Sequence, residues 1–164
     1  MRPIFINSFS LSALMRGVSD ECGVFGIFNH PDAVSIAHAG IYGLQHRGEE
    51  SWGVASVEKS VMNVYRCLGL ISKNLVDFGG NCAVAHTRYS TAGSSNLKNA
   101  QPTANGNQRW DIASNSFSRL EKLLGYPIAV AHNGNLTGEI AKNKTQSDTL
   151  SLMDEIGTPS DPLE

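Results

Sequence analysis

The sequence has few cysteines, no long apolar run and no excess of either charge. Cys22, Cys67 and Cys82 form an odd set without short paired spacing, which argues against a disulfide scaffold or a zinc knuckle and favours reduced thiols. No apolar run approaches the roughly 18–20 residues that span a bilayer. A formal net charge of −2 gives no concentrated positive field for nucleic acid or a membrane surface. We therefore expect a cytoplasmic protein that binds neither.

Residues 1–21, called the leader below, differ in composition from the rest of the 164-residue chain, which has the length of about one domain. The leader holds two arginines and four serines, and its only acidic residues are Asp20 and Glu21. A transit peptide has a similar composition, so organelle targeting stays open, whereas a secretory signal needs a longer apolar stretch. The alternative is a short propeptide or a disordered leader.

Apolar periodicity predicts more strands than helices. Alternating or β-branched and aromatic runs predict strands, and apolar residues three and four apart predict helices. The expected strands are 22–28, 52–57, 61–67, 81–89 and 128–132, and the expected helices are 34–44, capped by Asp32 and ended by Gly48, and 148–156. Strand-helix-strand units are few, which favours an α+β fold over a doubly wound parallel sheet.

Two segments give weaker signals. Residues 91–107 are rich in glycine, serine and asparagine, which is typical of a polar loop. Residues 108–126 are ambiguous, with a weak helical pattern through Phe117, Leu120 and Leu124.

Cys22 can act as a nucleophile only as a thiolate, which needs a nearby base. Cleavage between Glu21 and Cys22 would create an α-amino group on the same residue, and the ordinary pKa of that group, about 8, suits proton transfer near neutral pH. A free cysteine at the start of a strand is more often a buried core residue. The residue alone therefore does not establish a catalytic role.

Four other residues are candidates with simpler alternatives. Asn133-Gly134 follows a strand, where it predicts either a tight turn or a pair of oxyanion donors. Arg88 could bind a carboxylate through two hydrogen bonds, or it could be a surface arginine. Asp148 could pair with an ammonium group, or it could be an acidic residue at a helix N-terminus.

Six motifs occur in the order found in one protein family. They are CGVFGIF from residue 22, YGLQHRGEES from 42, HTRYSTAGSS from 86, NAQP from 99, AHNGNLTG from 131 and SDT from 147. Together they resemble the class II glutamine amidotransferase domain of the amidophosphoribosyltransferase family, which opens purine biosynthesis. The resemblance covers about residues 22–150.

The resemblance implies an N-terminal-nucleophile hydrolase fold, a four-layer αββα sandwich of antiparallel sheets, here incomplete at the C-terminus. It implies that Cys22 attacks the side-chain amide of glutamine to form a thioester, which water converts to glutamate after ammonia leaves. Asn133 and Gly134 match the oxyanion-hole positions of the family. Short propeptides that end in acidic residues precede this cysteine in some members, as Asp20 and Glu21 do here.

The resemblance also assigns substrate-binding residues. Arg88 and Thr91 match the residues that hold the α-carboxylate of glutamine, and Asp148 matches the residue that holds its α-ammonium group. Arg47 and Gly48 match the loop beside the nucleophile.

We expect the leader at 1–21, a glutamine amidotransferase type 2 domain at 22–157 and a tail at 158–164, without the phosphoribosyltransferase domain of the family. No metal site is expected, because the five histidines show no metal-ligand spacing. No cofactor is expected in this chain, because Mg²⁺ belongs to the family's second domain, as would a 4Fe–4S cluster, whose presence in the parent protein stays open. The implied partners are L-glutamine and a chain that carries a phosphoribosyltransferase, and the parent family forms homo-oligomers.

The sequence departs from the family pattern in three places. Glu49 stands where glutamine is usual, residues 103–126 differ from the expected pattern, and the chain between Thr137 and Ser147 is short by about a helix and a turn. The sequence therefore also allows a non-catalytic truncated fragment or a glutamine-binding module.

Overall fold

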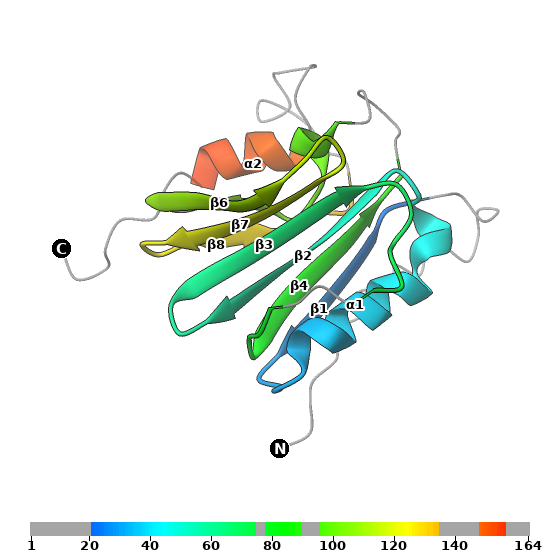
Figure 1. Cartoon of the computed structure of the whole chain (residues 1–164). Coiled ribbons are helices and arrows are strands. Elements are labelled where there is room, and N and C mark those ends of the chain that lie inside the picture. The colour runs from blue at the N-terminus through cyan, green and yellow to red at the C-terminus, as the bar shows by residue number, and fades with distance from the viewer. Residues whose placement is uncertain (1–20, 75–77, 90–95, 135–147, 157–164) are drawn as a thin grey trace.

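The computed structural model describes residues 21–74, 78–89, 96–134 and 148–156. Its large sheet has six antiparallel strands in the order β1-β4-β2-β3-β7-β6, and its small sheet pairs β5 with β8 (Figure 1). The strands are β1 (Gly23–Phe28), β2 (Ser51–Glu58), β3 (Val61–Leu68), β4 (Cys82–Arg88), β5 (Thr103–Asn105), β6 (Gln108–Ser114), β7 (Ser118–Leu124) and β8 (Ile128–Val130). The strands predicted over 22–28, 52–57, 61–67, 81–89 and 128–132 are confirmed within two residues at each end.

The first helix, α1 (Ala33–Gly43), is also confirmed, but its ends differ from those predicted. Asp32 occupies the N-cap position without a side-chain hydrogen bond to the helix. The helix ends at Gly43, and a 3₁₀ turn, η2 (Gln45–Arg47), follows and ends at Gly48. The apolar face of α1 faces the sheet because Val34, Ala37 and Ile41 recur at helical spacing and are buried.

The elements form four layers. Helix α1 packs against β1, β2 and β4 on one face of the large sheet (Figure 1). On the other face, Ala104 of β5 and Ala129 of β8 pack against a cluster that includes Val64 and Leu123. The second helix, α2 (Asp148–Ile156), packs against β5. The α+β class and the αββα arrangement of antiparallel sheets are therefore confirmed, as is the helix predicted at 148–156.

Residues 108–126 form the β6–β7 hairpin, so the weak helical pattern there was misleading. The turn is stabilised by the Asn115 side chain, whose Oδ1 accepts hydrogen bonds from the backbone N–H groups of Phe117 and Ser118, both at 2.8 Å. Strand β7 then pairs with β3 over its length. This long-range pairing overrides the local helical periodicity, because strand formation depends more on neighbouring strands than on intrinsic preference.

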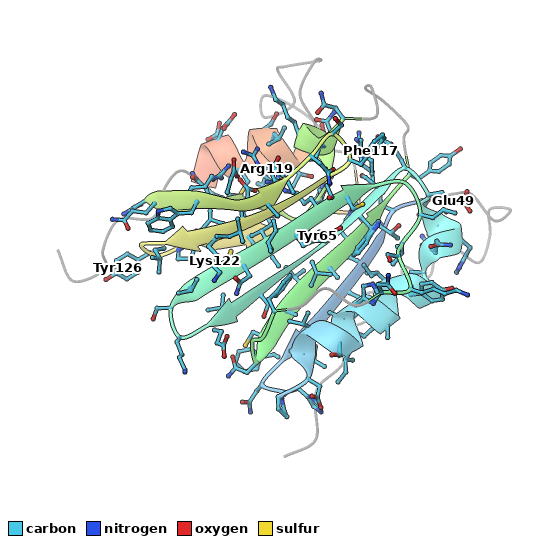
Figure 2. All side chains as sticks on the ribbon, viewed as in Figure 1. Glu49, Tyr65, Phe117, Arg119, Lys122 and Tyr126 are labelled. Carbon is cyan, nitrogen blue, oxygen red and sulfur yellow. The ribbon has the colours of Figure 1, made fainter. Side chains whose placement is uncertain are left out.

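A charged cluster lies across β3, β7 and β6. Glu121 is fully buried and forms ion pairs with Arg66, which is also buried, with Arg109 at 3.2 Å and with Arg119 at 3.5 Å. Arg119 also binds Asp111 through two hydrogen bonds, at 2.6 and 2.8 Å. Figure 2 shows Arg119 near the hairpin turn. Burial lowers the pKa of Arg66, and the charge of Glu121 opposes that change. The cluster therefore depends on Glu121 to neutralise the arginines around it.

No helix in the described ranges is long and apolar enough to cross a membrane.

Candidate active site

Cys22 immediately precedes β1, and the first residue of that strand, Gly23, pairs with Thr87 near the end of β4. This register brings the thiol to the chain just after β4, where Cys22 Sγ lies 3.8 Å from the carbonyl oxygen of Tyr89. The cysteine is partly exposed. A partly exposed thiol at a sheet end is accessible to a small substrate, unlike a cysteine enclosed in the core.

Two side chains from distant parts of the sequence converge on the backbone of Cys22. The Asn133 side-chain amide donates a hydrogen bond to the Cys22 carbonyl oxygen at 2.7 Å, although the two residues are 111 positions apart. Arg47 Nε donates to the same oxygen at 3.4 Å. The other end of the Arg47 guanidinium pairs with the Glu21 carboxylate at 3.2 Å. The end of the small sheet and the loop after α1 therefore meet at the predicted nucleophile.

Gly48 lets this loop approach β4 closely. A side-chain carbon at this position would lie 2.4 Å from the carbonyl carbon of Arg88, which is well inside van der Waals contact. The Thr87 hydroxyl donates a short hydrogen bond to the Gly48 carbonyl oxygen. The absence of a side chain at Gly48 therefore allows this loop to pack directly against the backbone at the end of β4.

Arg88 forms an ion pair with Glu50, with 3.0 Å between the nitrogen and the oxygen. Each of the two side chains is only 8% exposed. The backbone is joined as well, because the Glu50 N–H donates to the Arg88 carbonyl oxygen at 3.1 Å. The predicted carboxylate-binding residue thus already has a buried acidic neighbour.

A buried histidine connects β4 to the segment that carries Asn133. The imidazole of His86 is fully buried, and its Nε2 lies 3.3 Å from the His132 carbonyl oxygen. Burial lowers the pKa of His86 to about 3, the nearby Arg88 charge adds to this change, and the His132 carbonyl opposes it. His86 is therefore neutral near pH 7, and Nε2 is its donor. The Gln101 side chain fixes the same segment by accepting a 2.7 Å hydrogen bond from the His132 N–H.

The remaining predicted residues are placed as follows. Asn133 and Gly134 are exposed, and Gly134 has a φ of 157°, which residues with side chains rarely adopt. Thr91 lies outside the described residues. Asp148 is the first residue of α2, which packs against β5, so it belongs to the layer beside the small sheet.

Sequence reasoning assigned no functional role to Glu50, Gln101 or His86. Both Glu50 and Gln101 lie inside motifs that carried the resemblance, YGLQHRGEES and NAQP. The sequence signal was therefore present, but their partners come from other strands. His86 was expected to be a structural histidine, and its contact with His132 is consistent with that role.

No group of three or more histidine, cysteine, aspartate or glutamate side chains in the described ranges gathers as metal ligands would.

A cysteine just before the first strand of an αββα sandwich of antiparallel sheets is the arrangement of the N-terminal-nucleophile hydrolase fold. Comparison with curated proteins finds amidophosphoribosyltransferases similar to this chain. The chain is 37% identical over 139 residues to an amidophosphoribosyltransferase of Lacticaseibacillus casei, covering 81% of this chain and 63% of the relative. It is 36% identical over 148 residues to that of Synechococcus elongatus, covering 87% of this chain and 26% of the relative. It is 41% identical over 123 residues to that of a Synechocystis species, covering 71% of this chain and 22% of the relative.

Over most of its length, then, the chain is similar to the N-terminal part of amidophosphoribosyltransferases, which are enzymes. It spans less than two thirds of each of these relatives. Two solved structures are also similar. One is the glutamine phosphoribosylpyrophosphate amidotransferase of B. subtilis complexed with ADP and GMP, with 32% identity and a TM-score of 0.46 over 52% of this chain and 19% of that chain. The other is an allosteric regulatory enzyme of purine biosynthesis, with 35% identity and a TM-score of 0.45 over 49% of this chain and 18% of that chain. No protein-family model matches the chain.

Proposed function

We propose that this chain hydrolyses L-glutamine to glutamate and ammonia, with Cys22 as the N-terminal nucleophile. The observation that supports this most is the convergence of Arg47 and Asn133 on the backbone carbonyl of Cys22, because it joins three separate motifs at one partly exposed cysteine. The similarity to amidophosphoribosyltransferases supports glutamine as the substrate.

In the first half of the reaction, the α-amino group of Cys22 takes the proton of the thiol. The thiolate sulfur then attacks the side-chain amide carbon (Cδ) of glutamine, so a sulfur–carbon bond forms and the carbonyl oxygen becomes an oxyanion. The Asn133 amide carries two hydrogens, so one can bond the Cys22 carbonyl while the second bonds the oxyanion. The Gly134 N–H is the second donor of the proposed oxyanion hole. As the carbon–nitrogen bond breaks, the α-ammonium group returns its proton and ammonia leaves.

In the second half, water attacks the γ-glutamyl thioester. The carbon–sulfur bond breaks, glutamate leaves and the thiol is restored. Arg88 and Thr91 hold the α-carboxylate of the substrate throughout, and the family resemblance assigns its α-ammonium group to Asp148. Arg47 and Gly48 position the backbone of Cys22.

The leader must be removed before this chemistry can begin. While Glu21 is bonded to Cys22, the cysteine nitrogen is an amide and cannot accept a proton from the thiol. The Glu21 carboxylate also pairs with Arg47 in the uncleaved chain. The chain with its leader attached is therefore an inactive precursor.

The wider role follows from the relatives' names. We infer that the ammonia is destined for phosphoribosyl pyrophosphate, in the first step of purine biosynthesis, on a phosphoribosyltransferase domain. A chain that carries this domain is the expected partner, and the expected location is cytoplasmic.

The test is ammonia release from L-glutamine by the processed protein, compared with Cys22→Ala and with Cys67→Ala as a matched control. Cys67 is a partly exposed cysteine in β3, outside the proposed site. We expect Cys22→Ala to abolish turnover and Cys67→Ala to retain it. Equal turnover by all three proteins would show that the proposal is wrong.

A further inference from the structure

Strand β6 ends the large sheet, and its outer edge pairs with no other strand in the described ranges (Figure 1). All seven of its residues are exposed, among them two large apolar side chains, Trp110 at 45% and Ile112 at 52%. The open edge of a strand carries a row of backbone N–H and C=O groups that can pair with another chain. Pairing at this edge would also cover apolar surface that water now contacts.

The charges of β6 are complementary to those of a second copy of the same strand. Arg109 and Asp111 lie two positions apart, so they point to the same face of the sheet, and Trp110 between them points to the other face. Strand β7 holds both charged side chains. Arg109 pairs with Glu121 at 3.2 Å, and Asp111 pairs with Arg119 at 2.6 Å. The side chains of Arg109 and Asp111 are nevertheless 42% and 46% exposed, so each can contact a further charge.

Symmetry allows few registers for such a pairing. Two identical antiparallel edges that continue one sheet are related by a two-fold axis perpendicular to it, so the pairing is centred on a residue that faces its own copy. Centring on Arg109 or on Asp111 sets like charges directly opposite each other, which is destabilising. Centring on Trp110 instead sets Arg109 opposite Asp111 at two symmetric positions. The same register brings the two Trp110 side chains together, and aromatic pairs of this kind are favourable.

The irregularity of β6 agrees with the register centred on Trp110. In that register the two strands pair over residues 108–112. The pairing of β6 with β7 shifts between Asp111 and Ala113, and a bulge of this kind bends a strand. The bulge therefore limits the paired segment to the part of β6 that carries the complementary charges.

We propose that the outer edge of β6 is a dimer interface, at which two copies of this chain form one continuous antiparallel sheet centred on Trp110. Strand β6 lies in the stretch that departs from the family pattern, so the interface belongs to this chain and not to the resemblance. It is independent of the proposed glutamine hydrolysis. Because the paired segment is short, the interface is small, and the dimer forms reversibly as the protein concentration rises.

The experiment measures the mass of the full chain by sedimentation from about 1 to 300 µM, a range that brackets weak association. The mass should rise from the 17.6 kDa of one chain toward twice that value. Asp111→Lys sets two positive charges opposite each other, and Arg109→Glu sets two negative ones. Each variant alone should dimerise roughly 10- to 100-fold more weakly than the wild-type protein. An equal mixture of the two should dimerise again, because a mixed pair restores opposite charges at both positions.

Two results would overturn the proposal. One is a wild-type chain that stays monomeric over the whole range. The other is a mixture that stays monomeric although the wild-type chain dimerises, which would exclude this register. Arg109 also pairs with the buried Glu121, so Trp110→Arg serves if Arg109→Glu does not fold. Trp110→Arg sets like charges at the centre of the pairing and should stay monomeric.

The matched control for Trp110→Arg is Phe28→Arg. Phe28 is an aromatic residue, 75% exposed, on β1 at the opposite edge of the same sheet. Phe28→Arg should dimerise as the wild-type chain does. A dimer that is lost in Phe28→Arg and retained in Trp110→Arg would place the interface at β1 and contradict the proposal.

Discussion

The burial of His86 makes the stability of this protein depend on pH. Its pKa is about 3 in the folded protein and 6.5 without the fold. Between these values the unfolded chain binds one more proton than the folded chain, so the free energy of unfolding falls as the pH falls, by about 1.4 kcal/mol per pH unit. Above about pH 6.5, the contribution of His86 to the free energy of unfolding no longer changes with pH. When the pH falls from 7.5 to 5.0, the titration of His86 alone should therefore lower the free energy of unfolding by about 2 kcal/mol.

The assay is urea unfolding at both pH values, followed by the fluorescence of the tryptophans, of which Trp52 is fully buried. The comparison protein is His86→Gln, whose amide does not titrate and can still donate to the His132 carbonyl. Burial also lowers the pKa of His38, but that residue contributes equally in both proteins. The wild-type protein should lose about 2 kcal/mol more than the variant over this range. An identical loss in both proteins would refute the role of His86.

Three substitutions test other parts of the structure. Gly48→Ala should destabilise the protein by about 1–3 kcal/mol and lower kcat/KM, because the new side-chain carbon meets the Arg88 backbone. The neutral control is Gly43→Ala, since nothing lies within 4 Å of a side-chain carbon at that position. Thermal melting and kinetics compare the two variants. Glu121→Ala should cost about 3–5 kcal/mol in urea unfolding, and an effect below about 1 kcal/mol would mean that the charged cluster contributes as little as a surface ion pair. Asn133→Ala should lower kcat by about 100- to 1,000-fold, and an unchanged kcat would remove Asn133 from the oxyanion hole.

The parts of the fold that could be predicted have strong local patterns. Strand β4 alternates clearly, α1 has one apolar face, and α2 begins at the expected residue. Residues 108–126 could not be predicted because Phe117, Leu120 and Leu124 also fit helical spacing. Their structure is determined by pairing with β3, whose residues lie between 51 (Cys67 to Ser118) and 61 (Met62 to Leu123) positions earlier in the chain.

The candidate site shows the same division. Motif order alone made Cys22, Asn133 and Arg88 candidate site residues, and their roles stay predictions. The ion pair between Arg88 and Glu50 depends on the register of β2 against β4, in which Ser51 pairs with Arg88. No local sequence pattern predicts the pairing register of β2 and β4, because the two strands are joined through β3 and a long connection. Sequence therefore identified the charged residues, and structure identified which of them are neighbours.

The most direct test of the central claim is the intact mass of the protein measured beside its rate of glutamine hydrolysis. We predict that ammonia release rises in proportion to the fraction of molecules that begin at Cys22, and that molecules that retain residues 1–21 release none. Full turnover by a preparation in which every molecule keeps the leader would contradict the N-terminal nucleophile mechanism.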